Sequence, residues 1–198
     1  MVIALEPALQ ALREGRPIVL PTDTVYGVGV MPAVPGAVAA LFRAKGRSGT
    51  NPLPVLGASV EALAGVADFD PVARRLARRF WPGPLTLVLR RAEGWFYDLG
   101  GKDRATVGVR VPACGIAREI LVQAGPLAVS SANRAGGAPA TTVAEAREAL
   151  GRSIEVYIDG GVKAGAASTV LSLVGPPVVL REGDIPASKL LGREEHAG

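Results

Sequence analysis

Residues 21–29 read PTDTVYGVG and follow a short apolar run at residues 18–20. This order predicts a strand, a polar turn and a second strand, with glycines where the backbone must bend or approach a neighbour closely. Three polar side chains directly after a buried strand are typical of a ligand site. A hairpin turn in which Asp23 and the threonines bond to their own backbone explains the same pattern equally well. From these residues alone, both interpretations remain open.

The composition predicts one soluble globular domain, because 48% of the 198 residues are apolar and 20% are charged. The net charge of +4 suits a polyanionic ligand but is too small to establish nucleic-acid binding. Cys114 is the single cysteine, and no basic region precedes an apolar run at the N-terminus, so we expect a cytoplasmic location. Prolines and glycines interrupt the uncharged residues 24–42, so no membrane span is expected.

Helical and extended patterns alternate along the chain, which predicts an α/β sheet with helices packed on it. Helices are expected at residues 5–13, 35–45, 71–80, 116–123, 143–150 and 185–191, and strands at 18–20, 53–56, 85–89, 106–111, 127–129, 156–158, 169–174 and 178–180. Asp70 is an expected N-cap, and Thr142 with Glu145 forms an expected capping box. Residues 90–104 are expected to form a mobile loop in which Trp95 and Phe96 are held against the protein.

Several kinds of chemistry are excluded by the residues that the chain lacks. The single histidine, His196, lies three residues from the end, where it does not suit a Ser-His-Asp or Cys-His mechanism. No Cys/His cluster with metal-ligand spacing occurs, so no protein metal site is expected. No phosphate-binding loop of the GxxxxGK[ST] type occurs, and Pro32 occupies the third glycine position of a dinucleotide fingerprint. An enzyme built from this chain would act by positioning and electrostatics.

Two basic segments have both a functional and a structural explanation. Residues 45–51 place Lys45, Arg47 and Asn51 at the end of a predicted helix, which suits phosphate oxygens. Cations at a helix C-terminus are also favoured by the helix dipole. Four arginines share one side of the predicted helix at residues 71–80, namely Arg74, Arg75, Arg78 and Arg79. A solvated helix face explains these four, and a patch for a polyanion is the alternative.

The remaining polar candidates lie in or next to predicted strands. Arg110 alternates with Val107, Val109 and Val111, so its guanidinium shares the other strand face with Gly108. A guanidinium in a central strand needs a carboxylate or phosphate partner, which can be a ligand or an acid of the protein itself. Residues 130–133, SSAN, end one strand, and residues 168–169, ST, begin another. Ligands gather at strand ends in open α/β sheets, although serine-rich turns are also ordinary loops.

The ordered motifs PTDTVYGxG at residues 21–29, KGR at 45–47, WPGPLT at 81–86, VRVP at 109–112, SAN at 131–133 and DGG at 159–161 carry a resemblance. The sequence resembles the threonylcarbamoyl-AMP synthase (YrdC-like) family in its short single-domain form, over about residues 5–183. The resemblance implies a twisted open mixed sheet with helices packed on it and a large, positively charged central cavity. Residues 1–185 would form the catalytic domain, and residues 186–198 a short C-terminal helix and polar tail.

The resemblance also implies an activity and a set of site residues. L-Threonine, bicarbonate or CO2, and ATP would be condensed into threonylcarbamoyl-adenylate and pyrophosphate, for threonylcarbamoyladenosine modification of tRNA by downstream transfer machinery. The implied threonine ligands are Thr22, Arg110, Ser131 and Ser168; the implied ATP ligands are Lys45, Arg47, Asn51, Thr106, Asn133, Thr141 and Arg181. Lys45, Arg47 and Arg110 would be the catalytic residues, Mg2+ would accompany ATP, and weak binding of tRNA is expected.

Three positions depart from the family's pattern. Asp23 stands where glutamate is commoner, Ala167 where a glutamate is expected, and Leu56 where some members have histidine. Two alternatives of other kinds remain open. One is a non-catalytic RNA-binding module that uses the arginine face of residues 74–79, and the other is a carbamoyl-transfer domain like that used in hydrogenase maturation.

Overall fold

The computed structural model describes residues 5–46, 51–163 and 165–191. Its described part contains a mixed sheet with the strand order β7-β1-β2-β6-β3-β5-β4-β8-β9. The strands are β1 (Ile18–Pro21), β2 (Tyr26–Val30), β3 (Val55–Leu56), β4 (Leu85–Arg90), β5 (Thr106–Arg110), β6 (Leu127–Ser131), β7 (Val156–Tyr157), β8 (Thr169–Ser172) and β9 (Val178–Arg181). The helices are α1 (Glu6–Arg13), α2 (Ala37–Lys45), α3 (Val60–Leu63), α4 (Pro71–Phe80), α5 (Gly115–Ala124), α6 (Val143–Leu150) and α7 (Ala187–Leu190), with a 3-10 turn at Gly151–Ser153.

The motif at residues 21–29 forms an antiparallel hairpin of β1 and β2, as the sequence predicts. Strand β2 then pairs with β6, so that Gly27 lies opposite Ser131. A Cβ atom on Gly27 would come within 2.7 Å of Val129 Cγ1, so this position requires glycine. Tyr26 is fully buried, and its hydroxyl donates a 2.8 Å hydrogen bond to the carbonyl of Gly161. The first motif therefore connects the SAN and DGG motifs, although they lie far apart in the sequence.

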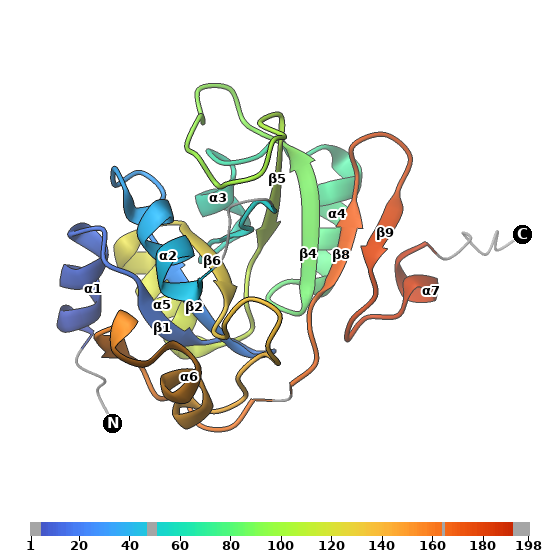
Figure 1. Ribbon diagram of the computed structural model, residues 1–198. Helices are drawn as coiled ribbons and strands as arrows, with labels where there is room; N and C mark the ends of the chain where they lie inside the picture. Colours follow the sequence, from blue (N-terminus) through green and yellow to red (C-terminus); the bar gives the residue numbers. More distant parts are fainter. Residues whose placement is uncertain (1–4, 47–50, 164, 192–198) are drawn as a thin grey trace, which may run out of the picture.

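Helices cover the sheet in two groups (Figure 1). Helices α1 and α5 lie side by side, and their apolar residues pack with β1 and β6 in one buried cluster that includes Leu12, Leu20 and Ile120. Helix α4 lies behind β4 and β8 in Figure 1 and packs in the other cluster. There its Leu76 joins the alternate leucines of β4, whereas Thr86 and Val88 of the same strand line a cavity on the opposite face. Helix α4 and the cavity thus lie on opposite faces of the sheet.

The predicted helix caps are confirmed. Asp70 Oδ1 accepts a 2.7 Å hydrogen bond from the amide of Ala73 at the start of α4. Thr142 Oγ1 accepts from the amide of Glu145, at 3.1 Å, at the start of α6. The Glu145 carboxylate reaches back to the amide of Thr141, at 2.7 Å, one residue earlier than in the usual capping box. The segment from 81 to 84 ends α4 as expected, with a cis peptide bond between Trp81 and Pro82.

The structure corrects the sequence analysis at several places. Trp95 is buried, but the Phe96 side chain is 82% exposed, so the prediction that both aromatic residues are held against the protein is wrong for Phe96. Helix α2 begins at Ala37 instead of residue 35, because Gly36 has a φ of 79° and interrupts the helical backbone. Helix α3 was not predicted, since its four residues are too few to show a helical period. No helix in the described ranges is long and apolar enough to span a membrane.

Candidate active site

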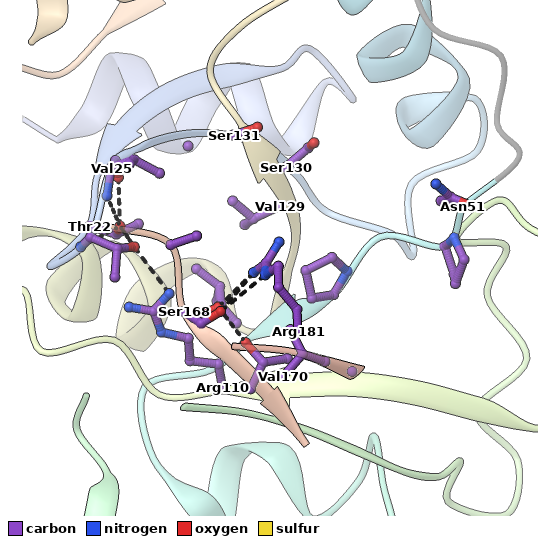
Figure 2. A pocket seen from close by; sticks show the side chains of 18 of the residues that line it. Thr22, Val25, Asn51, Arg110, Val129, Ser130, Ser131, Ser168, Val170 and Arg181 are labelled. Carbon is purple, nitrogen blue, oxygen red and sulfur yellow. Dashed lines mark hydrogen bonds between the residues drawn. The ribbon is translucent and has the colours of Figure 1, made fainter. Parts of the chain in front are cut away.

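A cavity of about 560 Å3 opens on the face of the sheet opposite α4 (Figure 2). Its polar lining comes from the β1–β2 turn and the start of β2, from the segment before β3, from strands β4, β5 and β6, and from the segment around β8 and β9. The polar side chains that line it are Thr22, Thr24, Tyr26, Asn51, Thr86, Thr106, Arg110, Ser130, Ser131, Ser168 and Arg181. This set includes every predicted threonine ligand and the predicted ATP ligands Asn51, Thr106 and Arg181.

Arg110 is held in the cavity wall by three different partners. Its Nε donates to the carbonyl of Gly83 at 2.9 Å, one terminal nitrogen donates to Thr24 Oγ1 at 3.2 Å, and the other donates to Asp23 Oδ1 at 2.6 Å. The guanidinium carries five N–H groups, so one N–H on each terminal nitrogen has no acceptor among the described residues. Because Arg110 lines the cavity, these two N–H groups are the part of the side chain left for a ligand carboxylate.

The acid partner of Arg110 is Asp23, a residue of the protein itself. From the sequence, this partner could have been either a ligand or an acid of the protein. The ion pair with Asp23 is largely buried, with side-chain exposures of 7% for Arg110 and 13% for Asp23. Burial lowers the pKa of the Arg110 guanidinium, and the Asp23 charge opposes this shift. Asp23 Oδ2 is buried without a hydrogen-bond partner in the described part of the chain. Asp23 therefore compensates the Arg110 charge while half of its own carboxylate stays unsatisfied.

The β1–β2 turn forms the local hydrogen bonds of a hairpin turn and also lines the cavity. Thr22 Oγ1 accepts hydrogen bonds from the amides of Thr24 and Val25, both at 3.2 Å, and donates to the carbonyl of Val25 at 2.6 Å. These local bonds are the turn chemistry expected of threonine. Thr22 and Thr24 also line the cavity, with their hydroxyl oxygens 3.0 Å apart, beside Arg110. The turn that closes the hairpin thus also supplies hydroxyl groups to the site.

A second group of side chains is organised by Ser168, just before β8 (Figure 2). Arg181 donates to the Ser168 carbonyl from Nε at 3.1 Å and from a terminal nitrogen at 2.9 Å, and this terminal nitrogen also lies 3.1 Å from Ser168 Oγ. The buried hydroxyl of Thr86 lies 3.0 Å from the same Oγ. The parallel pairing of β4 with β8 brings Thr86 and Ser168 together. Thr86 was quoted within a motif but not predicted as a site residue.

Asn51 and Thr106 also line the cavity, and Figure 2 shows Asn51 on the opposite side of Arg181 from Thr22. The Thr106 hydroxyl donates to the carboxylate of Asp103, so it is already engaged. Ser130 and Ser131 lie on the β6 wall between these two ends. In this view Arg110 and Thr22 thus lie on one side of the cavity and Asn51 on the other, with Arg181 between Thr22 and Asn51.

Other predicted ATP ligands lie outside the lining of this cavity. Lys45 Nζ donates to the carbonyls of Ser131 and Asn133, the latter at 2.7 Å, and its side chain is buried. The Asn133 amide donates to the carbonyls of Arg134 and Gly137, at 2.8 and 2.7 Å. The Thr141 hydroxyl donates to Glu145 at 3.0 Å. Arg47 lies outside the described residues, so its predicted role stays a prediction.

The described residues that line the cavity include no carboxylate, and the described part of the chain contains no cluster of three or more His, Cys, Asp or Glu side chains that could hold a metal ion. Hard cations such as Mg2+ prefer oxygen ligands, usually carboxylates together with water and substrate phosphates. The described cavity residues therefore do not fit a resident Mg2+ site. What the lining does provide is two guanidinium groups, several hydroxyls and one amide, a set that suits carboxylate and phosphate groups.

An open mixed α/β sheet with a cavity lined by arginines and hydroxyls is the arrangement expected of a domain that binds small anionic or zwitterionic molecules. The sequence profile of the Sua5/YciO/YrdC family, described as telomere recombination, matches residues 10–183. This chain belongs to that family. A protein of Mycobacterium leprae named putative threonylcarbamoyl-AMP synthase is 43% identical over 186 residues, which cover 92% of this chain and 84% of the relative.

Similar solved structures agree with this assignment. The structure of Pyrococcus abyssi Sua5 complexed with L-threonine has a TM-score of 0.85 and 39% identity, and the match covers 95% of this chain and 57% of that chain. This chain thus spans little more than half of the Pyrococcus protein. The structure of E. coli YciO has a TM-score of 0.84 and 26% identity, with 94% and 91% of the two chains covered. The fold class and the family expected from the motifs are therefore confirmed.

Proposed function

We propose that this protein is a threonylcarbamoyl-AMP synthase, a nucleotidyltransferase that condenses L-threonine, bicarbonate or CO2, and ATP into threonylcarbamoyl-adenylate and pyrophosphate. The single observation that carries the proposal is the cavity, which gathers Thr22, Arg110, Ser131 and Ser168 beside Arg181. Relatives that carry this name are 41 to 43% identical to the chain, and one similar structure holds L-threonine. A purely RNA-binding module needs no such set of convergent hydroxyl and guanidinium groups.

The reaction needs positioning more than proton transfer. The amine of threonine adds to CO2 and loses a proton, which gives a carbamate. A carbamate oxygen then attacks the α-phosphorus of ATP, and the bond to the β-phosphate breaks as pyrophosphate leaves. Arginine side chains near the phosphates neutralise the negative charge that is transferred in such a step. This chemistry requires no histidine among the described residues that line the cavity.

We assign the side of the cavity with Arg110 to threonine and the side with Arg181 and Asn51 to ATP. The two remaining N–H groups of Arg110 bind the α-carboxylate, and Thr22, Ser131 and Ser168 surround the amino acid. Asn51, Thr106 and Arg181 contact the nucleotide, together with Lys45, Arg47, Asn133 and Thr141 once ATP is bound. Mg2+ would be supplied together with ATP and would neutralise charge on the phosphates, since the described lining offers no carboxylate for a resident metal ion.

The experiment incubates the full chain with ATP, bicarbonate and threonine, and detects the adenylate by mass and pyrophosphate by a coupled assay. Formation of both products that depends on threonine supports the proposal, and its absence contradicts it. The variant Arg110→Ala is expected to abolish threonine-dependent pyrophosphate release, whereas Arg118→Ala, on an exposed face of α5, leaves it intact. An unchanged rate in Arg110→Ala would reject the assigned role of Arg110.

The product feeds the machinery that transfers threonylcarbamoyl groups to tRNA, and we propose that tRNA binds weakly to α4. Arg74, Arg75, Arg78 and Arg79 are all exposed, and no carboxylate pairs with them in the described residues. This face lies across the sheet from the cavity, so bound RNA would leave the cavity open. Binding through four phosphates predicts a slope of log K against log salt of about −3 to −4.

The test replaces these four arginines by glutamine and measures tRNA binding at several salt concentrations. The control removes the same charge elsewhere, through Arg13→Gln, Arg43→Gln, Arg118→Gln and Arg152→Gln, all at exposed positions. Loss of binding and of the salt slope in the α4 variant alone supports the docking face. Equal loss in both variants indicates a non-specific charge effect, and tight binding to anionic vesicles instead of tRNA would overturn the choice of RNA.

A further inference from the structure

The two arginines of the cavity have partners of different charge. Arg110 donates to the Asp23 carboxylate at 2.6 Å, so the pair carries no net charge. Arg181 donates to the carbonyl and hydroxyl oxygens of Ser168, which are neutral groups. Among the described residues no carboxylate forms an ion pair with Arg181. One guanidinium of the cavity is thus electrically compensated, while the other keeps a full positive charge.

This asymmetry matters because the two substrates differ in charge. An amino acid is a zwitterion with no net charge, whereas the triphosphate of ATP carries several negative charges. Arginine binds phosphate at least as readily as carboxylate, and both cavity arginines have N–H groups in a fork. If Asp23 did not compensate it, the buried guanidinium of Arg110 would attract the nearest polyanion. The charge of Arg181 acts electrostatically on Arg110, so a polyanion attracted by one guanidinium would also be attracted by the other if neither were compensated.

We propose that Asp23 is a specificity-determining residue that reserves the Arg110 end of the cavity for the amino acid by cancelling the attraction of this guanidinium for phosphate. Asp23 acts through Arg110, since it does not line the cavity itself. The inference rests on the proposed function, because it presupposes that threonine and a polyphosphate share the cavity. In this proposal the Asp23 carboxylate determines that threonine, and not a polyphosphate, binds next to Arg110.

The surroundings of Asp23 favour this role over a purely stabilising one. Its Oδ2 is buried without a hydrogen-bond partner in the described part of the chain, and an unsatisfied buried carboxylate oxygen is unfavourable for folding. Nε of Arg110 is independently held by the Gly83 carbonyl, and one terminal nitrogen by Thr24. The guanidinium therefore keeps two of its protein contacts when Asp23 is neutralised. What changes most is the net charge that a ligand meets.

The experiment measures threonine binding by calorimetry without ATP, in the presence and absence of inorganic pyrophosphate. In the native protein, pyrophosphate is expected to leave the threonine Kd unchanged, because it binds near Arg181. In Asp23→Asn, pyrophosphate is expected to compete with threonine, with an affinity for the Arg110 end raised at least about tenfold, the effect of one charged hydrogen bond. Asp23→Ser, which is smaller, gives the same readout if the asparagine variant does not fold.

Matched variants make the outcome specific to this contact. Asp23→Glu keeps the charge and is expected to retain the native pattern. Asp184→Asn removes the same charge from an exposed residue that influences Arg110 without contacting it, and is also expected to retain the native pattern. Because Arg110 also binds threonine, the double variant Asp23→Asn with Arg110→Gln is titrated directly with pyrophosphate, and it is expected to lose the affinity for pyrophosphate that Asp23→Asn gains. The readout thus requires both partners of the ion pair.

The failures of the two proposals can be told apart. If pyrophosphate leaves the threonine Kd of Asp23→Asn unchanged, or if Asp184→Asn shows the same competition, the inference about Asp23 is overturned while the synthase function stands. If the native protein neither binds threonine nor forms the adenylate, the proposed function fails, and the inference that rests on it fails with it.

Discussion

The ammonium of Lys45, at the end of α2, donates a 2.7 Å hydrogen bond to the backbone carbonyl of Asn133, 88 residues further along the chain. It also donates to the carbonyl of Ser131 in β6. This buried lysine thus links the end of α2 to the SAN motif, whose Ser131 lines the cavity. The family resemblance implies that Lys45 binds ATP. In the structure its ammonium group also forms hydrogen bonds that connect two distant segments of the chain.

Replacing Lys45 by methionine is therefore expected to destabilise the fold. Two buried carbonyls lose a charged donor, which costs about 2–4 kcal/mol in the free energy of unfolding. Urea denaturation followed by circular dichroism measures this change. Lys102→Met, at an exposed position, is the control and should change stability by less than about 0.5 kcal/mol. A Lys45→Met variant as stable as the native protein would show that the two carbonyls find other donors.

Thr86 is expected to determine threonine affinity through Ser168. Thr86→Val keeps the shape but removes the hydroxyl 3.0 Å from Ser168 Oγ, so Ser168 keeps only Arg181 as a side-chain partner. The KM for threonine should rise about fivefold, the effect of ~1 kcal/mol, while the KM for ATP stays constant. Steady-state pyrophosphate release measures both constants. Ser188→Ala, which removes an exposed hydroxyl, serves as the control, and a uniform rise in both KM values would argue against this role.

The contribution of the start of α6 to the stability of the fold should decrease at acidic pH. Hydrogen bonds from the Thr141 amide and then the Thr141 hydroxyl lower the pKa of Glu145 below its ordinary value of 4.5. A lowered pKa in the folded state means that Glu145 stabilises the fold above pH 4.5 and that this contribution is lost as the pH falls through the folded pKa. Glu145→Gln should therefore lower Tm at pH 7 but have little effect near pH 3. Thermal unfolding across this range checks the prediction, with Glu148→Gln on the same helix as control.

The local parts of this site could be predicted from the sequence. The alternation of valines around Arg110 identifies the strand face that carries the guanidinium, because side chains alternate along any strand. The turn at residues 22–24 follows from the chemistry of threonine and aspartate next to a buried run. The helix caps at Asp70 and Thr142 depend on neighbours three residues away, and they too are found in the structure.

The long-range parts could not be predicted from patterns within short windows. Asp23 and Arg110 are 87 residues apart, and their contact depends on how the β1–β2 turn is placed against β5. Thr86 meets Ser168 only because β4 pairs with β8, which local periodicity does not reveal. Phe96 was expected to be buried from its hydrophobicity, but the neighbouring Trp95 takes the buried position and Phe96 is exposed. Tertiary context decides each of these cases.

Gly183 shows how closely the backbone around Ser168 is packed. A Cβ atom at this position would lie 2.1 Å from the carbonyl oxygen of Ala167 and 2.6 Å from the carbonyl carbon of Ser168. Both are backbone atoms, so Gly183→Ala requires the chain before β8 to move. The amide of Gly183 also donates to Thr169 Oγ1 at 2.9 Å, a bond that this movement would disturb.

Gly183→Ala is therefore expected to lower stability by about 1–3 kcal/mol, the usual result of overpacking, and to raise the KM for threonine because Ser168 is displaced. The matched control is Gly115→Ala at the start of α5, where a Cβ would meet no atom within 4 Å and where alanine should be neutral or stabilising by about 0.5–1 kcal/mol. Chemical denaturation and threonine-dependent pyrophosphate release measure the two effects. A Gly183→Ala enzyme with native stability and native KM would mean that the segment before β8 can shift without moving Ser168, and that the contacts between Arg181, Thr86 and Ser168 do not control threonine binding.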